Sequence, residues 1–166
     1  MSTRELIEEV VEMHGGWERW ARVHRIRAQL SLGGFIFSSH RQPAALRELE
    51  VIVSPRAPSV LLRGFGGEGY AGRWTPRRAQ LINPDGALIA DRLNPRASFT
   101  QFKKNFSWDP LDVVYFTGYS LWNYLSFPFQ LDTPDVKLTE FRAPDTSLVD
   151  RLTAQFDHRL PTHSIQ

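Results

Sequence analysis

Residues 108–129 read WDPLDVVYFTGYSLWNYLSFPF, a run that is apolar or aromatic at most of its positions. Asp109 and Pro110 form a favourable N-cap and first-turn pair, and Pro128 cannot continue a helix. The pattern therefore predicts a helix from Pro110 to about Leu125. Because its surface is apolar nearly all round, this helix is expected to be buried.

The predicted helix belongs to a longer aromatic segment, residues 99–129, which holds 11 of the 20 aromatic residues of the chain. The concave face of a curved antiparallel sheet is the natural place to bury such a helix, and Gly118 would let the helix backbone approach the sheet closely. Asp112 interrupts the apolar surface. It either points to water at the start of the helix, where the helix dipole favours it, or pairs with an arginine such as Arg96.

Strand patterns dominate the sequence before this helix. Apolar and polar residues alternate over short runs, and Pro84, Asp85 and Gly86 give a strong hairpin signal. Gly33 and Gly34 indicate a bulge or a sharp bend, after which the strand is expected to resume. We predict strands at residues 26–32, 35–37, 49–53, 60–62, 70–74, 80–82 and 88–92, and after the helix at 136–141 and 152–156.

The order of these elements predicts an α+β fold in a single domain, residues 1–166. The strands follow one another at roughly ten-residue spacing with no helix between them, so the sheet should be antiparallel. Ser2 and Glu5 form a capping box that opens an amphipathic helix ending near Met13, expected to pack on an edge or end of the sheet. The expected architecture is an open, curved antiparallel sheet, an incomplete barrel wrapped around the buried aromatic helix.

Composition excludes several classes of protein. The 166 residues are 42% hydrophobic and 23% charged, which is typical of a globular protein, and the absence of cysteine excludes disulfides and thiolate sites. Net charge is only +2, so nucleic acid is not an expected partner. No apolar run approaches the roughly 20 residues of a membrane span. The N-terminal residues are acidic and amphipathic, unlike a signal peptide, so a soluble, cytoplasmic protein is expected.

Two motifs resemble catalytic or cofactor sites. Gly64 to Gly69 match G-x-G-x-x-G, but the residues that follow cannot open a helix, so a hairpin loop is expected instead of a dinucleotide site. Gly118, Ser120 and Trp122 match only half of a nucleophile elbow, since a second small residue and a preceding strand are missing. A hydrolase using Ser120, Asp112 and a histidine such as His163 stays open as an alternative.

The histidines do not predict a metal site, since no pair has the i, i+4 spacing of a helical zinc site. His158 and His163 lie near Asp157, where a solvated turn is favoured over a weak metal site. We therefore predict no metal and no cofactor.

The leading functional hypothesis is a non-enzymatic binder of an apolar or lipid-like small molecule in the hollow of the sheet. The alternative is that the same aromatic residues fill a solid core with no ligand, in a structural or interaction domain. The predicted ligand-binding residues are Phe99, Phe102, Trp108, Asp112, Phe116, Tyr119, Trp122 and Phe127.

Several segments resemble an uncharacterised family of bacterial proteins. They are His14 to Trp17 with Trp20, Asn94 to Phe99, Trp108 to Phe129, and Pro161 to Ser164. Members of that family continue with further strands, so the resemblance implies that this chain is shortened at its C-terminus. An unpaired sheet edge after residues 152–156 would then favour edge-to-edge self-association.

More distantly, the layout is similar to the lipoprotein-carrier (Lol-type) fold, an incomplete barrel whose helices cover an apolar hollow. That resemblance implies the binding of acyl chains. Carriers of that type are exported, whereas this sequence shows no export signal, so the resemblance supports the architecture more than a role in lipoprotein traffic.

Overall fold

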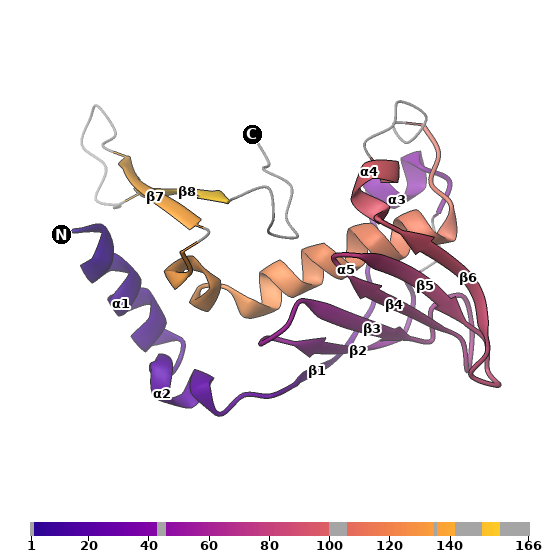
Figure 1. The fold of residues 1–166 in the computed structure, drawn as a ribbon, viewed down its shortest axis with the longest axis horizontal. Helices are drawn as coiled ribbons and strands as arrows, with labels where there is room; N and C mark the ends of the chain where they lie inside the picture. The colour runs from indigo at the N-terminus through magenta and orange to yellow at the C-terminus, as the bar shows by residue number, and fades with distance from the viewer. Residues whose placement is uncertain (1, 43–45, 100–105, 135, 142–150, 157–166) are drawn as a thin grey trace. The chain divides into compact units, whose positions relative to one another are not determined.

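The computed structural model describes residues 2–42, 46–99, 106–134, 136–141 and 151–156 (Figure 1). Its internal contacts divide the chain into two compact units. The large unit is His24–Leu125, and the small unit joins Met1–Val23 to Ser126–Gln166. A single domain over residues 1–166 stays a prediction.

The large unit is built on a six-stranded antiparallel sheet in which each strand pairs with its neighbours in sequence. Apolar and polar residues alternate along the strands, which places one apolar side of the sheet inward. The strands are β1 (Ile26–Leu30), β2 (Leu49–Ser54), β3 (Ser59–Arg63), β4 (Ala71–Thr75), β5 (Arg78–Ile82) and β6 (Leu88–Leu93). The G-x-G-x-x-G segment forms the turn between β3 and β4, so a strand follows it, as predicted.

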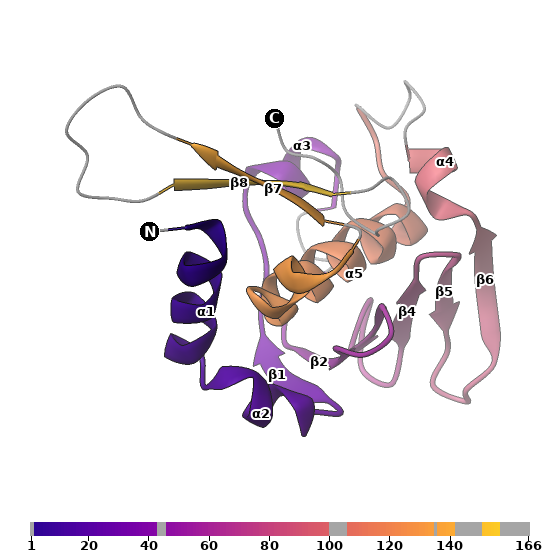
Figure 2. The same cartoon turned by 60° about the vertical axis from the view of Figure 1, so that its left-hand side comes forward.

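The aromatic helix is α5 (Pro110–Ser126), and Figure 2 shows the sheet curving around it. Val51, Val60 and Trp74 from the sheet, and Val113 and Val114 from the helix, are buried together in one hydrophobic core. Among the described strands β1 and β6 are the two edges and do not pair with each other, so the barrel is open. The predicted fold class is confirmed.

Two glycines set how closely α5 lies on β4. A Cβ atom added at Gly118 would lie 2.3 Å from the Cγ atom of Trp74. A Cβ atom added at Gly72 would lie 2.6 Å from a methyl carbon of Val114. Gly118 of the helix therefore leaves room for Trp74 of the strand, and Gly72 of the strand leaves room for Val114 of the helix. The close approach predicted at Gly118 is confirmed.

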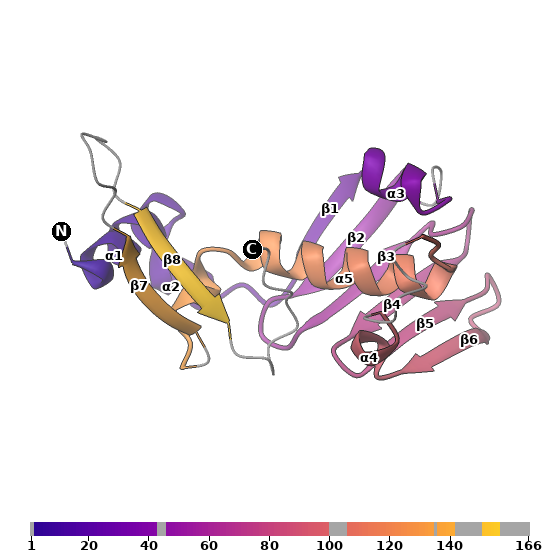
Figure 3. The ribbon, with the colours of Figure 1, turned by 90° about the horizontal axis from the view of Figure 1, so that it is seen from above.

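The strand predicted at residues 35–37 is wrong, because Phe35–Ser39 form a short helix, α3. Gly34 has φ 116° and ψ −178°, a conformation open to glycine, and it turns the chain away from the sheet before the helix begins. A helical period then places Phe37 inward while Phe35 stays exposed. A second short helix, α4 (Pro95–Phe99), follows β6 (Figure 3).

The small unit contains α1 (Thr3–Met13), α2 (Gly16–Ala21), the 3₁₀ helix η2 (Phe129–Asp132), β7 (Val136–Phe141) and β8 (Arg151–Phe156). The capping box at Ser2 and Glu5 is confirmed. Ile7 and Val11 pack with Phe129 in a separate small core, where the ring of Trp20 stacks on Phe129 at 4.1 Å.

β7 and β8 are strands, as predicted, but they pair with each other in a two-stranded sheet and do not extend the six-stranded one. The expected edge at residues 152–156 is therefore not an edge of the large sheet. The packing of the N-terminal helix on that sheet stays a prediction, since α1 belongs to the other unit.

Candidate functional site: an aromatic cluster in the large unit

Rings from three helices and a connecting segment meet in what we call the aromatic cluster. The ring of Trp108 lies 4.8 Å from that of Phe116 and 5.2 Å from that of Phe99. Phe37 meets both Trp108 and Phe116 edge-on. The cluster consists of Phe37 of α3, His40, Phe99 of α4, Trp108, and Tyr115, Phe116 and Tyr119 of α5.

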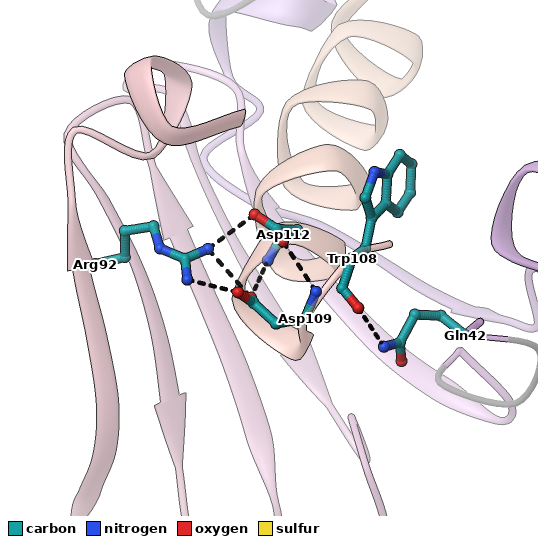
Figure 4. A network of polar contacts seen from close by, with 5 residues as sticks. All are labelled: Gln42, Arg92, Trp108, Asp109 and Asp112. Carbon is teal, nitrogen blue, oxygen red and sulfur yellow. Dashed lines mark hydrogen bonds and ion pairs between the residues drawn. The ribbon is translucent and has the colours of Figure 1, made fainter. Parts of the chain in front are cut away.

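Two hydrogen bonds join the connecting segment at Trp108 to the residues that follow α3. The amide N–H of Trp108 donates to the carbonyl oxygen of His40 at 3.3 Å, and the side-chain amide of Gln42 donates to the carbonyl oxygen of Trp108 at 2.7 Å (Figure 4). The imidazole of His40 stacks on the indole at 4.2 Å. Hydrogen bonds therefore hold the backbone of Trp108, and stacking on His40 holds its ring.

The rings of the cluster differ in their exposure to solvent. Phe37, Trp108 and Tyr115 are buried, whereas Phe99, Phe116 and Tyr119 are only half-buried. Burial raises the pKa of Tyr119 to about 12, and it also raises that of Tyr115. Both phenols are therefore neutral at physiological pH, although the charge of Arg96 acts on both of them.

Large apolar side chains that solvent reaches lie close to the cluster in sequence. Phe35 is 86% exposed and its neighbour Ile36 is also exposed, one and two positions from the buried Phe37. Phe106 is exposed two residues before Trp108. Single exposed apolar side chains are common on protein surfaces, so these three do not by themselves mark a binding surface.

Asp112 is the charged residue within α5, and it is 1% exposed. One of its carboxylate oxygens accepts from the Arg92 guanidinium at 2.8 Å, and the other accepts from the backbone N–H of Asp109 at 2.9 Å. The Asp109 carboxylate in turn accepts from the backbone N–H of Asp112 and from Arg92 at 2.7 Å (Figure 4).

This network confirms Asp109 as the N-cap of α5, and it confirms that Asp112 pairs with an arginine and does not point to water. The arginine is Arg92 of β6, where the sequence had suggested Arg96. Bonding to Asp109, together with the charges of both carboxylates, raises the pKa of Arg92 further above its ordinary value. With its carboxylate engaged on both oxygens, Asp112 is a structural residue and is removed from the candidate ligand contacts.

The other predicted site residues fall in different places. Phe99, Trp108, Phe116 and Tyr119 come together in the aromatic cluster. Trp122 is buried in the same core, and its indole N–H donates to the carbonyl oxygen of Ser54 at 3.2 Å. Phe102 lies outside the described residues. Phe127 is exposed and belongs to the small unit, so no shared site with the others follows.

Sequence reasoning missed three members of the cluster, Phe37, His40 and Tyr115. A helical reading of residues 35–40 would have placed Phe37 and His40 on one face, since they are three residues apart. Tyr115 and Tyr119 are likewise four apart on α5, and that spacing was available in the sequence.

The structure does not bring the residues of the hydrolase alternative together. Ser120 follows Asp112 by eight residues on the same helix, which separates them by about 12 Å along its axis. His158 and His163 lie outside the described residues. Within the described ranges, no group of three or more His, Asp or Glu side chains is arranged to hold a metal ion.

Over the described part of the chain, no helix combines the length and the hydropathy needed to cross a membrane. No protein-family model, no curated protein and no solved structure matches the chain.

Proposed function

We propose that this protein binds an apolar or lipid-like small molecule at the aromatic cluster, without catalysis. The observation that carries the proposal is the partial exposure of three rings of the cluster, since Phe99, Phe116 and Tyr119 are half-buried. An aliphatic chain laid on these rings would remove apolar surface from water.

The phenols support the same proposal. Tyr115 and Tyr119 are neutral at physiological pH, so these two residues bring no charge to a ligand laid against them. The rings of this surface therefore suit an apolar chain.

The test is the binding of a fluorescent long-chain fatty acid by the full chain, with Phe116→Ala as the variant. Loss of one ring should weaken binding about tenfold. Tyr124→Ala is the matched control, because Tyr124 is an exposed aromatic residue of the same helix. Binding that does not saturate, or that weakens equally in both variants, would contradict the proposal. Unfolding midpoints show whether each variant is folded.

A solid core that takes no ligand is the second candidate, and one observation favours it. Trp108 and Trp122 are buried, and each has a polar group bonded within the chain. Under this alternative Phe116→Ala lowers the free energy of unfolding, while the wild-type chain takes up no fatty acid.

We also propose that self-association uses β6. β6 exposes three large apolar residues, Leu88, Ile89 and Leu93, beside Asp91, whereas the opposite edge, β1, exposes Arg27 and Gln29. Apolar edge strands recruit further strands, and charged residues prevent this. Light scattering at micromolar concentration should show a dimer that Ile89→Lys dissociates and that Gln29→Lys leaves unchanged. A monomeric wild type would refute the proposal.

A further inference from the structure

The small unit holds a pocket of its own, separate from the aromatic cluster. Its volume is about 260 Å³, and side chains from α1, α2, η2 and β7 line it. Pockets for drug-sized ligands span roughly 300–1,000 Å³, so this one suits a smaller molecule.

The wall of the pocket is apolar. Ile7 is buried, and Trp17 and Leu138 are half-buried beside it. The ring of Trp17 is held by an edge-on contact with Phe129 at 5.5 Å, which belongs to the core of this unit. Because this ring is already held in place, a ligand that packs on it does not pay the entropy cost of ordering the side chain.

The rim of the pocket carries a net negative charge. Two carboxylates, Glu8 and Asp132, face one guanidinium, that of Arg4. Arg4 is bonded to Glu8 at 3.0 Å, and the charges of Glu8 and Asp132 both raise the pKa of Arg4. Because Arg4 balances one of the two carboxylates, the three side chains together carry one negative charge.

We propose that this pocket binds a small organic ammonium ion that carries an apolar group. The ammonium lies at the rim, where Asp132 supplies the charge that Arg4 leaves unbalanced. The apolar group packs on Ile7, Trp17 and Leu138, and the tryptophan ring adds attraction for a cation. An anion of the same shape meets two carboxylates and is rejected.

The test uses the full chain and three probes that differ only in their charged groups: 2-phenylethylammonium, 3-phenylpropionate and phenylalanine. Calorimetric titration should show saturable binding of 2-phenylethylammonium and much weaker binding of the other two. Equal binding of 3-phenylpropionate, or tighter binding of phenylalanine, would overturn the proposal, since either result shows that the net charge of the rim does not select the ligand.

Asp132→Asn is the decisive variant, because it removes the charge and keeps the shape. It should weaken 2-phenylethylammonium binding about tenfold, as expected for a charged hydrogen bond. Asp85→Asn, an equal change of charge in the exposed β5–β6 turn, is the matched control and should change nothing. Unchanged binding in Asp132→Asn overturns the proposal. Because Phe116→Ala leaves this pocket intact, failure here and failure at the aromatic cluster are distinguishable.

Discussion

Two helices of this protein, α1 and α5, begin with the same pair of reciprocal capping hydrogen bonds, but the two pairs differ in their exposure to solvent. In α1, Ser2 and Glu5 exchange side-chain and backbone hydrogen bonds at 3.3 and 2.7 Å. In α5, Asp109 and Asp112 do the same at 3.0 and 2.9 Å. Both arrangements satisfy backbone N–H groups at a helix start.

The difference lies in burial. The α1 box is exposed, and the hydrogen bonds from Ser2 are the largest cause of the lowered pKa of Glu5. The α5 box puts a carboxylate, that of Asp112, out of reach of water. A buried charge needs a counter-charge, so β6 supplies Arg92 to both carboxylates. A local motif therefore becomes a tertiary contact when it is buried.

Arg92→Met should have the largest effect, lowering the free energy of unfolding by about 3–5 kcal/mol, because it leaves Asp112 buried without its partner. Chemical denaturation measures the change. The matched control is Arg78→Met, which removes an exposed ion pair with Asp91 and should cost under about 1 kcal/mol. Adding Asp112→Asn to Arg92→Met should recover much of the loss. Equal effects of the two arginine variants would contradict the role given to burial.

Gly118→Ala should lower the free energy of unfolding by about 1–3 kcal/mol, because the new methyl group overlaps Trp74. In an exposed helix the same change is stabilising. Gly33→Ala is the control, since a Cβ atom there meets nothing within 4 Å. A neutral or stabilising Gly118→Ala would mean that α5 is not held against β4 as described.

Alkaline pH should destabilise the large unit through Tyr119. Its pKa is raised to about 12 in the folded chain against about 10 when unfolded, so its contribution is present below pH 10 and is lost as pH rises to 12. Phenolate absorbance and denaturation across this range measure the effect. Tyr119→Phe should reduce the slope of that part of the profile, while Tyr115, whose pKa burial also raises, still contributes to it. An unchanged profile would show that Tyr119 is not one of the groups responsible.

Ser2→Ala should have the smallest effect, about 1 kcal/mol on the local stability of α1, since it removes one exposed cap. Amide exchange in the first turn of α1 reports the change. Ser2→Asp keeps an acceptor at the cap and should preserve protection. A loss as large as that of Arg92→Met would mean that the two boxes do not differ as described.

Local patterns in the sequence were enough to predict most elements of the large unit. Alternation located the strands of the meander, and Asp109 with Pro110 located the start of α5, because these signals act over neighbouring residues. Part of the cluster was found as well, since Phe116 and Tyr119 lie within that helix. The prediction failed at residues 35–37, because a segment as short as Phe35–Ser39 allows both a strand and a helix.

By itself, the sequence determined the caps, the buried helix, the antiparallel meander and the glycine that lets α5 approach the sheet. Only the tertiary structure decided that Arg92 rather than Arg96 pairs with Asp112, that β7 and β8 pair apart from the large sheet, and that a pocket forms beside Trp17. The physical reason is range. Capping and periodicity depend on residues within one or two turns, whereas ion pairs, strand partners and pockets depend on segments far apart in the chain.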